Sequence, residues 1–218
     1  CYNIFKKELI KEKKINSKIL EIGSGSGFIK KIIPNAITSE IVKINDVDLV
    51  IDALKLPFKE NSLDTIILLN SLHHISDPKK FFEECNKVLK PDGLILLIEP
   101  ANTWFSRLIY KNFHHEDFNE NSKWEQKEGG RLTSANQAIP YIIFERDLSY
   151  FNKYYPNFSI IKNYKLKPFQ YILSGGLTYK PLINKNFINY FIRIIELISY
   201  PFNNFIGLFM FIKIKKIQ

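Results

Sequence analysis

A glycine-rich turn between a short apolar strand and a helix constrains the fold of this chain more than any other feature. Residues 18–22 are predicted to form the strand, residues 23–27 the turn, and residues 28–33 the helix before Pro34. Glycine lets the backbone turn tightly beside a ligand, and a helix N-terminus offers free N–H groups to an anion. The segment therefore predicts either a ligand-binding turn of an α/β domain or an ordinary glycine-rich loop.

Strand-like and helix-like segments alternate after the turn. Further strands are predicted at 36–38, 47–51, 65–70, 94–98, 159–165 and 208–217, and helices at 4–14, 77–89 and 187–200. Residues 90–93 have the composition of a turn, and residues 101–150 show no clean period. The alternation favours a Rossmann-like, seven-stranded, mostly parallel sheet with helices on both faces and an antiparallel C-terminal strand.

We interpret residues 1–218 as one domain. Its core spans 17–100, an insertion or lid spans about 101–150, and an acceptor cap with closing strands spans about 151–218. Between the second and third strands the chain has room for only a loop, which is short for a doubly wound fold.

The spacing of the glycines separates the possible ligands. A dinucleotide-binding turn needs a glycine at position 28, where this chain has Phe28, and a phosphate-binding loop needs Gly-Lys-Ser/Thr, which is absent from the turn. These differences disfavour a nicotinamide-dependent oxidoreductase and a nucleotide triphosphatase.

Four ordered segments resemble those of class I S-adenosylmethionine (SAM)-dependent methyltransferases of the type 11 kind. The segments are Glu21–Gly27, Asp52–Phe58, Asn70–Ile75 and Val88–Leu94. Together they cover about residues 17–100, and four motifs in order are more specific than one. The resemblance implies SAM as cofactor and methyl transfer as the reaction.

The resemblance also assigns roles to individual residues. For the methionine end of SAM, it implies that Gly23, Gly25 and Gly27 wrap around it and that Asn70 faces it. It implies that Glu21 accepts a hydrogen bond from the amino group of SAM or orders the turn. It also implies that Glu40 binds the ribose and that Asp52 reaches the adenine amino group, with Ala53 beside the ring. Two alternatives stay open: Glu40 as a solvated surface residue and Asp52 as a helix N-cap.

The four histidines occur as two adjacent pairs. His73 and His74 follow the fourth strand at the edge where α/β sheets bind ligands, which makes them candidates for catalysis or for packing of the cofactor loop. His114, His115 and Glu116 could form a wall of the acceptor pocket. Adjacent histidines rarely converge on one ion, so we predict no metal.

Charge and composition bear on partners. The net charge is +9, but the lysines are scattered and arginine occurs only at Arg107, Arg131, Arg146 and Arg193, which argues against nucleic acid. Two cysteines, no visible signal peptide and no membrane-spanning run favour a cytoplasmic protein. The apolar helix at 187–200 could contact a membrane surface or a second subunit. Because the chain begins at Cys1, we expect N-terminal residues to be missing.

The sequence therefore predicts a SAM-dependent methyltransferase that acts on a small-molecule, glycan or lipid-linked acceptor. The alternatives are a non-catalytic SAM-binding partner subunit and a nucleic-acid methyltransferase. The latter is disfavoured because the Asn/Asp-Pro-Pro-Tyr motif of amino-methylating enzymes is missing, the fourth strand being followed by Asn-Ser-Leu-His.

Overall fold

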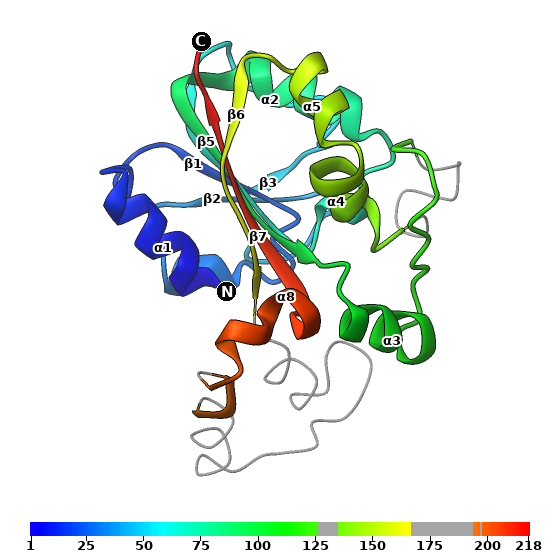
Figure 1. The fold of residues 1–218 in the computed structure, drawn as a ribbon. Coiled ribbons are helices and arrows are strands. Elements are labelled where there is room, and N and C mark those ends of the chain that lie inside the picture. The colour runs from blue at the N-terminus through cyan, green and yellow to red at the C-terminus, as the bar shows by residue number, and fades with distance from the viewer. Residues whose placement is uncertain (126–134, 167–193, 197) are drawn as a thin grey trace.

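The strands form one seven-stranded sheet in a computed structural model that describes residues 1–125, 135–166, 194–196 and 198–218 (Figure 1). The strand order is β3-β2-β1-β4-β5-β7-β6. The strands are β1 (Ile19–Ile22), β2 (Ile37–Glu40), β3 (Leu49–Val50), β4 (Leu63–Leu69), β5 (Leu89–Pro100), β6 (Phe158–Leu166) and β7 (Phe209–Lys216).

Strands β1 to β5 run parallel, and β7 lies antiparallel between β5 and β6. The predicted Rossmann-like sheet with its antiparallel C-terminal strand is confirmed. The strand order reverses between β1 and β4, and open α/β sheets bind ligands outside the carboxyl ends of the strands at such a point. The topology thus places the glycine turn after β1 and Asn70 after β4 at the expected binding edge.

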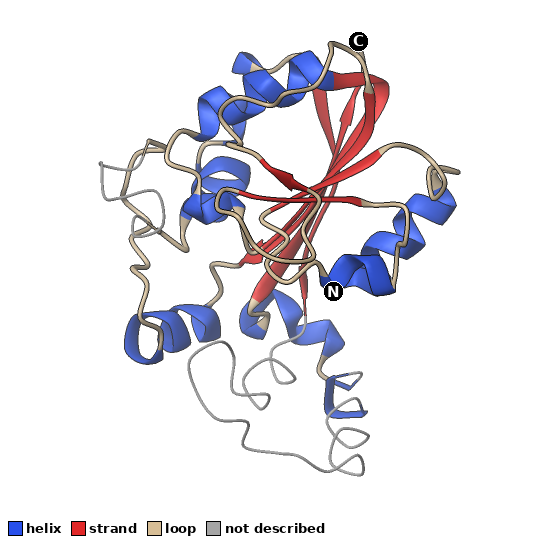
Figure 2. Cartoon of the chain, turned by 180° about the vertical axis from the view of Figure 1, so that it is seen from behind, coloured by secondary structure: helices blue, strands red, loops and turns tan. Residues whose placement is uncertain are grey.

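Helices cover both faces of the sheet (Figure 2). The helices are α1 (Tyr2–Lys11), α2 (Pro78–Val88), α3 (Trp104–Phe113), α4 (Ile139–Tyr141), α5 (Leu148–Tyr154) and α8 (Asn203–Ile206). Shorter turns of helix are η1 (Phe28–Lys31), η2 (Leu72–His74), η3 (Ile142–Arg146) and η4 (Tyr200–Phe202). Helix α2 is capped as the sequence predicts, because Asp77 accepts the Lys80 N–H at 3.0 Å and Pro78 begins the helix.

Strand β7 carries side chains to both helical layers, because successive residues of a strand point to opposite faces. Phe211 packs against Phe5 of α1 on one face, with the two rings tilted by 45°. On the other face, the Lys216 ammonium donates to the carbonyl oxygens of Asn86 and Leu89 at 2.6 and 2.7 Å, at the C-terminal end of α2. A cation at this end of a helix satisfies carbonyl groups that the helix leaves unpaired.

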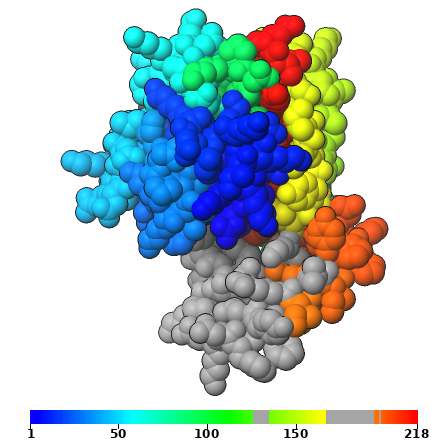
Figure 3. Space-filling model, turned by 90° about the vertical axis from the view of Figure 1, so that its left-hand side faces the viewer, coloured from blue at the N-terminus to red at the C-terminus, as the bar shows by residue number. Residues whose placement is uncertain are grey.

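A group of ion pairs joins the α1 region to strands β6 and β7. In the space-filling view, α1 lies beside β6 (Figure 3). Lys213 of β7 pairs with Glu8 at 3.0 Å and with Glu12 at 2.5 Å, and Lys162 of β6 pairs with Glu8 at 2.5 Å. The Lys213 side chain is only 2% exposed. Its charge is tolerated because two carboxylates compensate it.

Several local predictions were wrong in detail. The helix predicted after the glycine turn is only the short 3-10 turn η1. Residues 90–93, predicted to form a turn, belong to β5 instead. The pairing of β5 with β4 shifts register there, between Leu63 and Thr65 of β4, and Asp92 has a φ of +62°. The part of 101–150 without clean periodicity contains a regular helix, α3, which begins at a capping box between Thr103 and Ser106.

The loop predicted between the second and third strands is confirmed, since residues 41–48 contain no helix. Asp48 holds this loop against β2 by accepting hydrogen bonds from the Thr38 N–H and hydroxyl, both at 2.9 Å. The helix predicted at 187–200 lies largely outside the described residues. Within the described ranges, no helix is long and apolar enough to cross a membrane.

The buried ion group yields a stability prediction. Replacing Lys213 with alanine (Lys213→Ala) leaves Glu8 with Lys162 alone and Glu12 without its lysine, so unfolding free energy should fall by about 3 kcal/mol. Lys215→Ala is the matched control, because Lys215 pairs with the exposed Asp92. Chemical denaturation of both variants measures the difference, and equal stability of the two variants would contradict this account.

Candidate functional site

The glycine turn after β1 adopts the left-handed backbone that its composition predicts. Gly23, Gly25 and Gly27 have φ values of +70°, +55° and +69°. A Cβ on Gly23 would lie 2.3 Å from the Ser71 hydroxyl oxygen, whereas a Cβ on Gly25 would meet nothing within 4 Å. The turn therefore packs against the segment after β4 at Gly23 and opens to free space at Gly25.

Glu21 places a buried carboxylate beneath this turn. The residue is 0% exposed, and neither of its carboxylate oxygens makes a hydrogen bond of standard geometry within the described part of the chain. Burial raises the pKa of Glu21 to about 7, although the nearby Ser24 and Tyr2 hydroxyls partly offset it. A buried carboxylate of this kind fits a ligand that brings a hydrogen-bond donor or a positive charge.

The other predicted cofactor residues lie along the same edge of the sheet. Glu40 ends β2, and its carboxylate accepts the Gly25 N–H at 2.7 Å, which ties it to the glycine turn. Asp52 follows β3 and accepts the Leu54 N–H at 2.9 Å, which closes a turn; residues 53–60 contain no helix for it to cap. Ala53 packs against the core beside it.

Asn70 stands directly after β4, where its φ of +53° is a conformation that asparagine tolerates better than most residues. Its side-chain oxygen is buried and accepts no hydrogen bond from any described residue. Like Glu21, it presents a buried acceptor that the protein itself does not satisfy.

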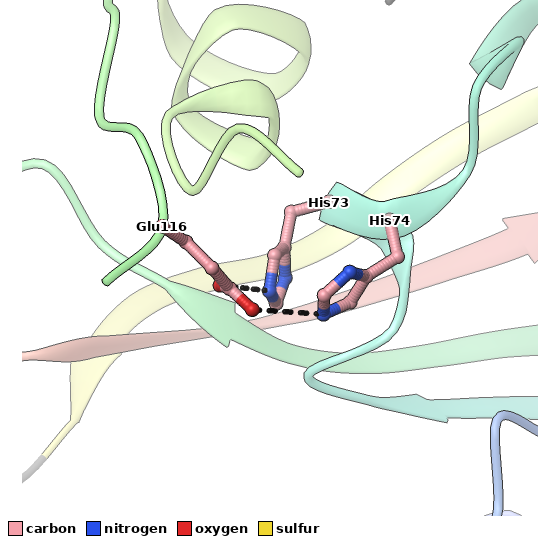
Figure 4. Close-up of side chains that lie close together, drawn as sticks. All are labelled: His73, His74 and Glu116. Carbon is pink, nitrogen blue, oxygen red and sulfur yellow. Dashed lines mark ion pairs between the residues drawn. The ribbon is translucent and has the colours of Figure 1, made fainter. Parts of the chain in front are cut away.

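The two histidine pairs, 40 residues apart in sequence, meet at Glu116, and Figure 4 shows the first pair, His73 and His74, beside it. The Nε2 atom of His73 lies 3.4 Å from one carboxylate oxygen of Glu116, and Nε2 of His74 lies 3.5 Å from the other. His115 also approaches this carboxylate, at 3.6 Å. The structure therefore joins the predicted catalytic residues and the predicted acceptor residues into one site.

Glu99, at the end of β5, fixes the position of this cluster, and sequence analysis missed its role. One of its oxygens accepts the N–H groups of Ser71 and Leu72 at 2.8 Å each, and the other accepts the Nδ1–H of His73 at 2.7 Å. Glu99 is completely buried. The signal was a lone carboxylate directly after the apolar run Leu94–Ile98, since a buried charge must be paired.

Gln137 holds Glu116 from the opposite side. Its Nε2 group donates to Glu116 at 2.9 Å and contacts His114 Nδ1 at 2.6 Å, while His114 Nδ1 also accepts the Glu116 N–H. The side-chain oxygen of Gln137 is buried and accepts no hydrogen bond from the described residues. Gln137 was not among the residues singled out in the sequence, because an isolated glutamine carries no motif.

These contacts shift the pKa values of His73, His74 and Glu116 in different directions. Burial alone would lower the pKa of His73, but Glu116 and Glu99 outweigh it and raise that pKa to about 9. Burial would raise the pKa of Glu116, but His73 and Gln137 bring it down to about 2. The pKa of His74 is lowered by burial and by the positive charge of His73.

A pocket opens between the cluster and the end of β7. It is lined by Asn70, His73, His74, Pro100, Tyr110, His114, Glu116, Gln137 and Phe209. Asn70 belongs both to this pocket and to the edge that carries the glycine turn. The pocket thus adjoins the predicted cofactor site.

Residues 20–97 match the family model described as a methyltransferase domain. Solved SAM-dependent methyltransferases share the fold. The protein from Archaeoglobus fulgidus has a TM-score of 0.55 at 16% identity, covering 99% of this chain and 94% of that one. The protein from Thermotoga maritima has a TM-score of 0.55 at 16% identity, covering 92% and 82%. Residues 20–97 thus resemble a methyltransferase domain in sequence, and the fold is that of solved SAM-dependent methyltransferases.

Curated proteins with similar sequences carry different names. An uncharacterized protein of Methanocaldococcus jannaschii, MJ1252, is 34% identical over 61% of this chain and 56% of its own length. The human mitochondrial arginine-hydroxylase NDUFAF5 is 32% identical over 35% of this chain and 27% of its own length. Demethylmenaquinone methyltransferase of Renibacterium salmoninarum is 32% identical over 31% and 30%. The matches thus span about half of the first relative and less than a third of the others.

The residues present fit SAM, the cofactor of this domain. The buried carboxylate of Glu21 can receive the ammonium group of the methionine part, and the free space at Gly25 leaves room beside the turn. Glu40 lies where a ribose contact is expected in this family. The fit rests on the buried oxygens of Glu21 and Asn70, which accept no hydrogen bond from a described residue and which donors of SAM would pair.

We expect Glu21 to make the binding of SAM sensitive to pH. At pH 5.5 most of the free protein carries a neutral Glu21, because its pKa is near 7, and the proton must leave before an ammonium can pair with it. SAM affinity should therefore be about tenfold weaker at pH 5.5 than at pH 7. Calorimetric titration at both values tests this, with Glu21→Gln expected to bind weakly and equally at both. A wild-type affinity that does not change with pH would refute the assignment.

Proposed function

We propose that the chain transfers the methyl group of SAM to an amine nitrogen or a hydroxyl oxygen of a small polar acceptor bound in the pocket beside Asn70. The observation that carries this proposal is a pair of buried side-chain oxygens, from Asn70 and Gln137, that line the pocket and accept no hydrogen bond from the described residues. Two N–H or O–H donors of an acceptor would satisfy them, one for each oxygen.

Methyl transfer from a sulfonium depends mainly on the alignment of the acceptor with the methyl group. When bound, SAM supplies a methyl group on a sulfonium, which passes to the acceptor's lone pair as the carbon–sulfur bond breaks and the acceptor loses a proton. Asn70 stands between the glycine turn and the pocket and can orient the acceptor toward the cofactor side. Alignment of this kind supplies much of the lowering of such a barrier.

The two predicted catalytic histidines have different roles in this proposal. The His73 side chain is 4% exposed and bound to Glu99, so it positions its neighbours. The His74 side chain is 37% exposed and lines the pocket, so it is the histidine that contacts the acceptor. His114 and Gln137 hold Glu116 and close the other wall. Apolar surface from Pro100 and Phe209 faces the carbon skeleton of the acceptor.

Glycans and lipid-linked acceptors present the same hydroxyl groups as small molecules and belong to the same proposal. A non-catalytic SAM-binding subunit is the alternative from another class. The name of NDUFAF5, an arginine-hydroxylase, shows that a related domain is also associated with a different reaction.

Gln137→Leu tests the role of the pocket. The variant loses the unpaired oxygen and the donor to Glu116, so methyl transfer should fall by about tenfold or more while SAM affinity stays near wild type. The measurement is transfer of labelled methyl from SAM to a panel of amines, phenols, sugars and lipid-linked sugars, beside calorimetry with SAM.

Asn112→Ala is the matched control, because Asn112 is exposed and donates only to the backbone oxygen of Leu108. If Gln137→Leu transferred labelled methyl to an acceptor at the wild-type rate, the pocket assignment would be overturned. A wild-type chain that binds SAM but labels no acceptor in the panel or in a cell extract would favour the non-catalytic subunit.

A further inference from the structure

We propose that His73, His74 and Glu116 bind a divalent first-row transition-metal ion at the mouth of the pocket. One ligand atom from each residue lies within 4.8 Å of the other two, and Figure 4 shows both imidazoles directed at the carboxylate. This departs from the expectation of no metal, which rested on adjacency in sequence. The short turn η2 brings both rings to the same side, with centroids 4.3 Å apart.

The contacts of His73 and His74 with the two oxygens of Glu116 are longer than the shortest hydrogen bonds in the cluster and are compatible with ligands of one ion. Hydrogen bonds between an imidazolium and a carboxylate are about 2.7–2.9 Å long, as in the 2.7 Å contact between His73 and Glu99. The two contacts with Glu116 are 3.4 and 3.5 Å. Ligand atoms at the corners of a tetrahedron with bonds near 2.1 Å are about 3.4 Å apart. A small rotation of the half-exposed His74 completes the approach.

The surroundings of the cluster supply the outer contacts that metal ligands require. A histidine ligand usually donates its second ring N–H to a carboxylate, which fixes the ring and its tautomer. His73 does so toward Glu99, so that its Nε2 is directed toward Glu116. The carboxylate of Glu116 is oriented by the Gln137 amide. Glu99 thus orients His73 through Nδ1, and Gln137 orients Glu116 through Oε2, the oxygen that also faces His73.

Three protein ligands leave at least one position open, which is the pattern of catalytic rather than structural sites. Two imidazoles and one carboxylate select a transition metal over Mg²⁺ or Ca²⁺, which prefer oxygen ligands. The open position faces the pocket that Asn70 and Gln137 share. An acceptor oxygen or nitrogen bound there would lose its proton more readily. This role rests on the proposed methyl transfer, whereas the binding of the ion does not.

The test uses the full chain after treatment with a chelator. Equilibrium dialysis with Zn²⁺, and with Fe²⁺ under anaerobic conditions, should give one bound ion per chain, and Mg²⁺ at the same concentration should give none. Co²⁺ should give the visible absorption of a low-symmetry site. A chain that binds none of these ions, or that binds Mg²⁺ as well as Zn²⁺, would overturn the proposal.

Variants separate ligands from neighbours. His74→Ala should weaken Zn²⁺ binding by more than about a hundredfold, and Glu99→Gln by about ten- to a hundredfold. Glu120→Gln, on the same segment as Glu116 but paired with Lys111, should leave it unchanged. Wild-type Zn²⁺ affinity in His74→Ala would also overturn the site. Calorimetry with SAM on each variant checks that the cofactor site is intact.

The experiment keeps this proposal distinct from the proposed function. Zn²⁺ binding that depends on His74, in a chain that transfers no methyl group, would support the metal site and reject the role for the pocket. Methyl transfer by a chain that binds no transition metal would support the proposed function and reject the metal site.

Discussion

The buried carboxylate of Glu99 is the interaction on which the geometry of the site depends. It holds the two N–H groups at the start of η2 and the ring of His73 at the same time. Because it lies at the carboxyl end of β5, it transmits the position of the central sheet to the segment after β4. A charge buried there is stable only while all three donors stay in place, so the strand and the histidine segment are fixed as a unit.

This arrangement explains why the cofactor side and the acceptor side adjoin. Gly23 has no room for a side chain because Ser71, one of the residues that Glu99 holds, packs against it. Asn70, Ser71, His73 and His74 thus belong to one short segment between β4 and α2, and the glycine turn packs against that segment. A shift of that segment would disturb the cofactor edge and the pocket together.

The sheet and the cofactor edge could be predicted from sequence because they depend on local patterns. Apolar runs such as Leu63–Leu69 and the glycine spacing carry their meaning within a few residues. The convergence of His73 with Glu116 could not, since it depends on how the chain returns after α3. Helix α3 was missed because aromatic and polar residues obscured its period, and its capping box is local but short. The role of Glu99 depends on three donors that only the fold brings together.

The two sides of the pocket have different origins in the chain. Asn70, His73 and Pro100 come from the methyltransferase core, whereas Tyr110, His114, Glu116 and Gln137 come from the segment that follows it. The family model ends at residue 97, before any of the second group. A core can therefore keep its geometry while the following segment changes the shape of the proposed acceptor pocket. Because Gln137 and His114 also orient Glu116, a change in that segment would alter the charge facing the acceptor as well as the shape of the pocket.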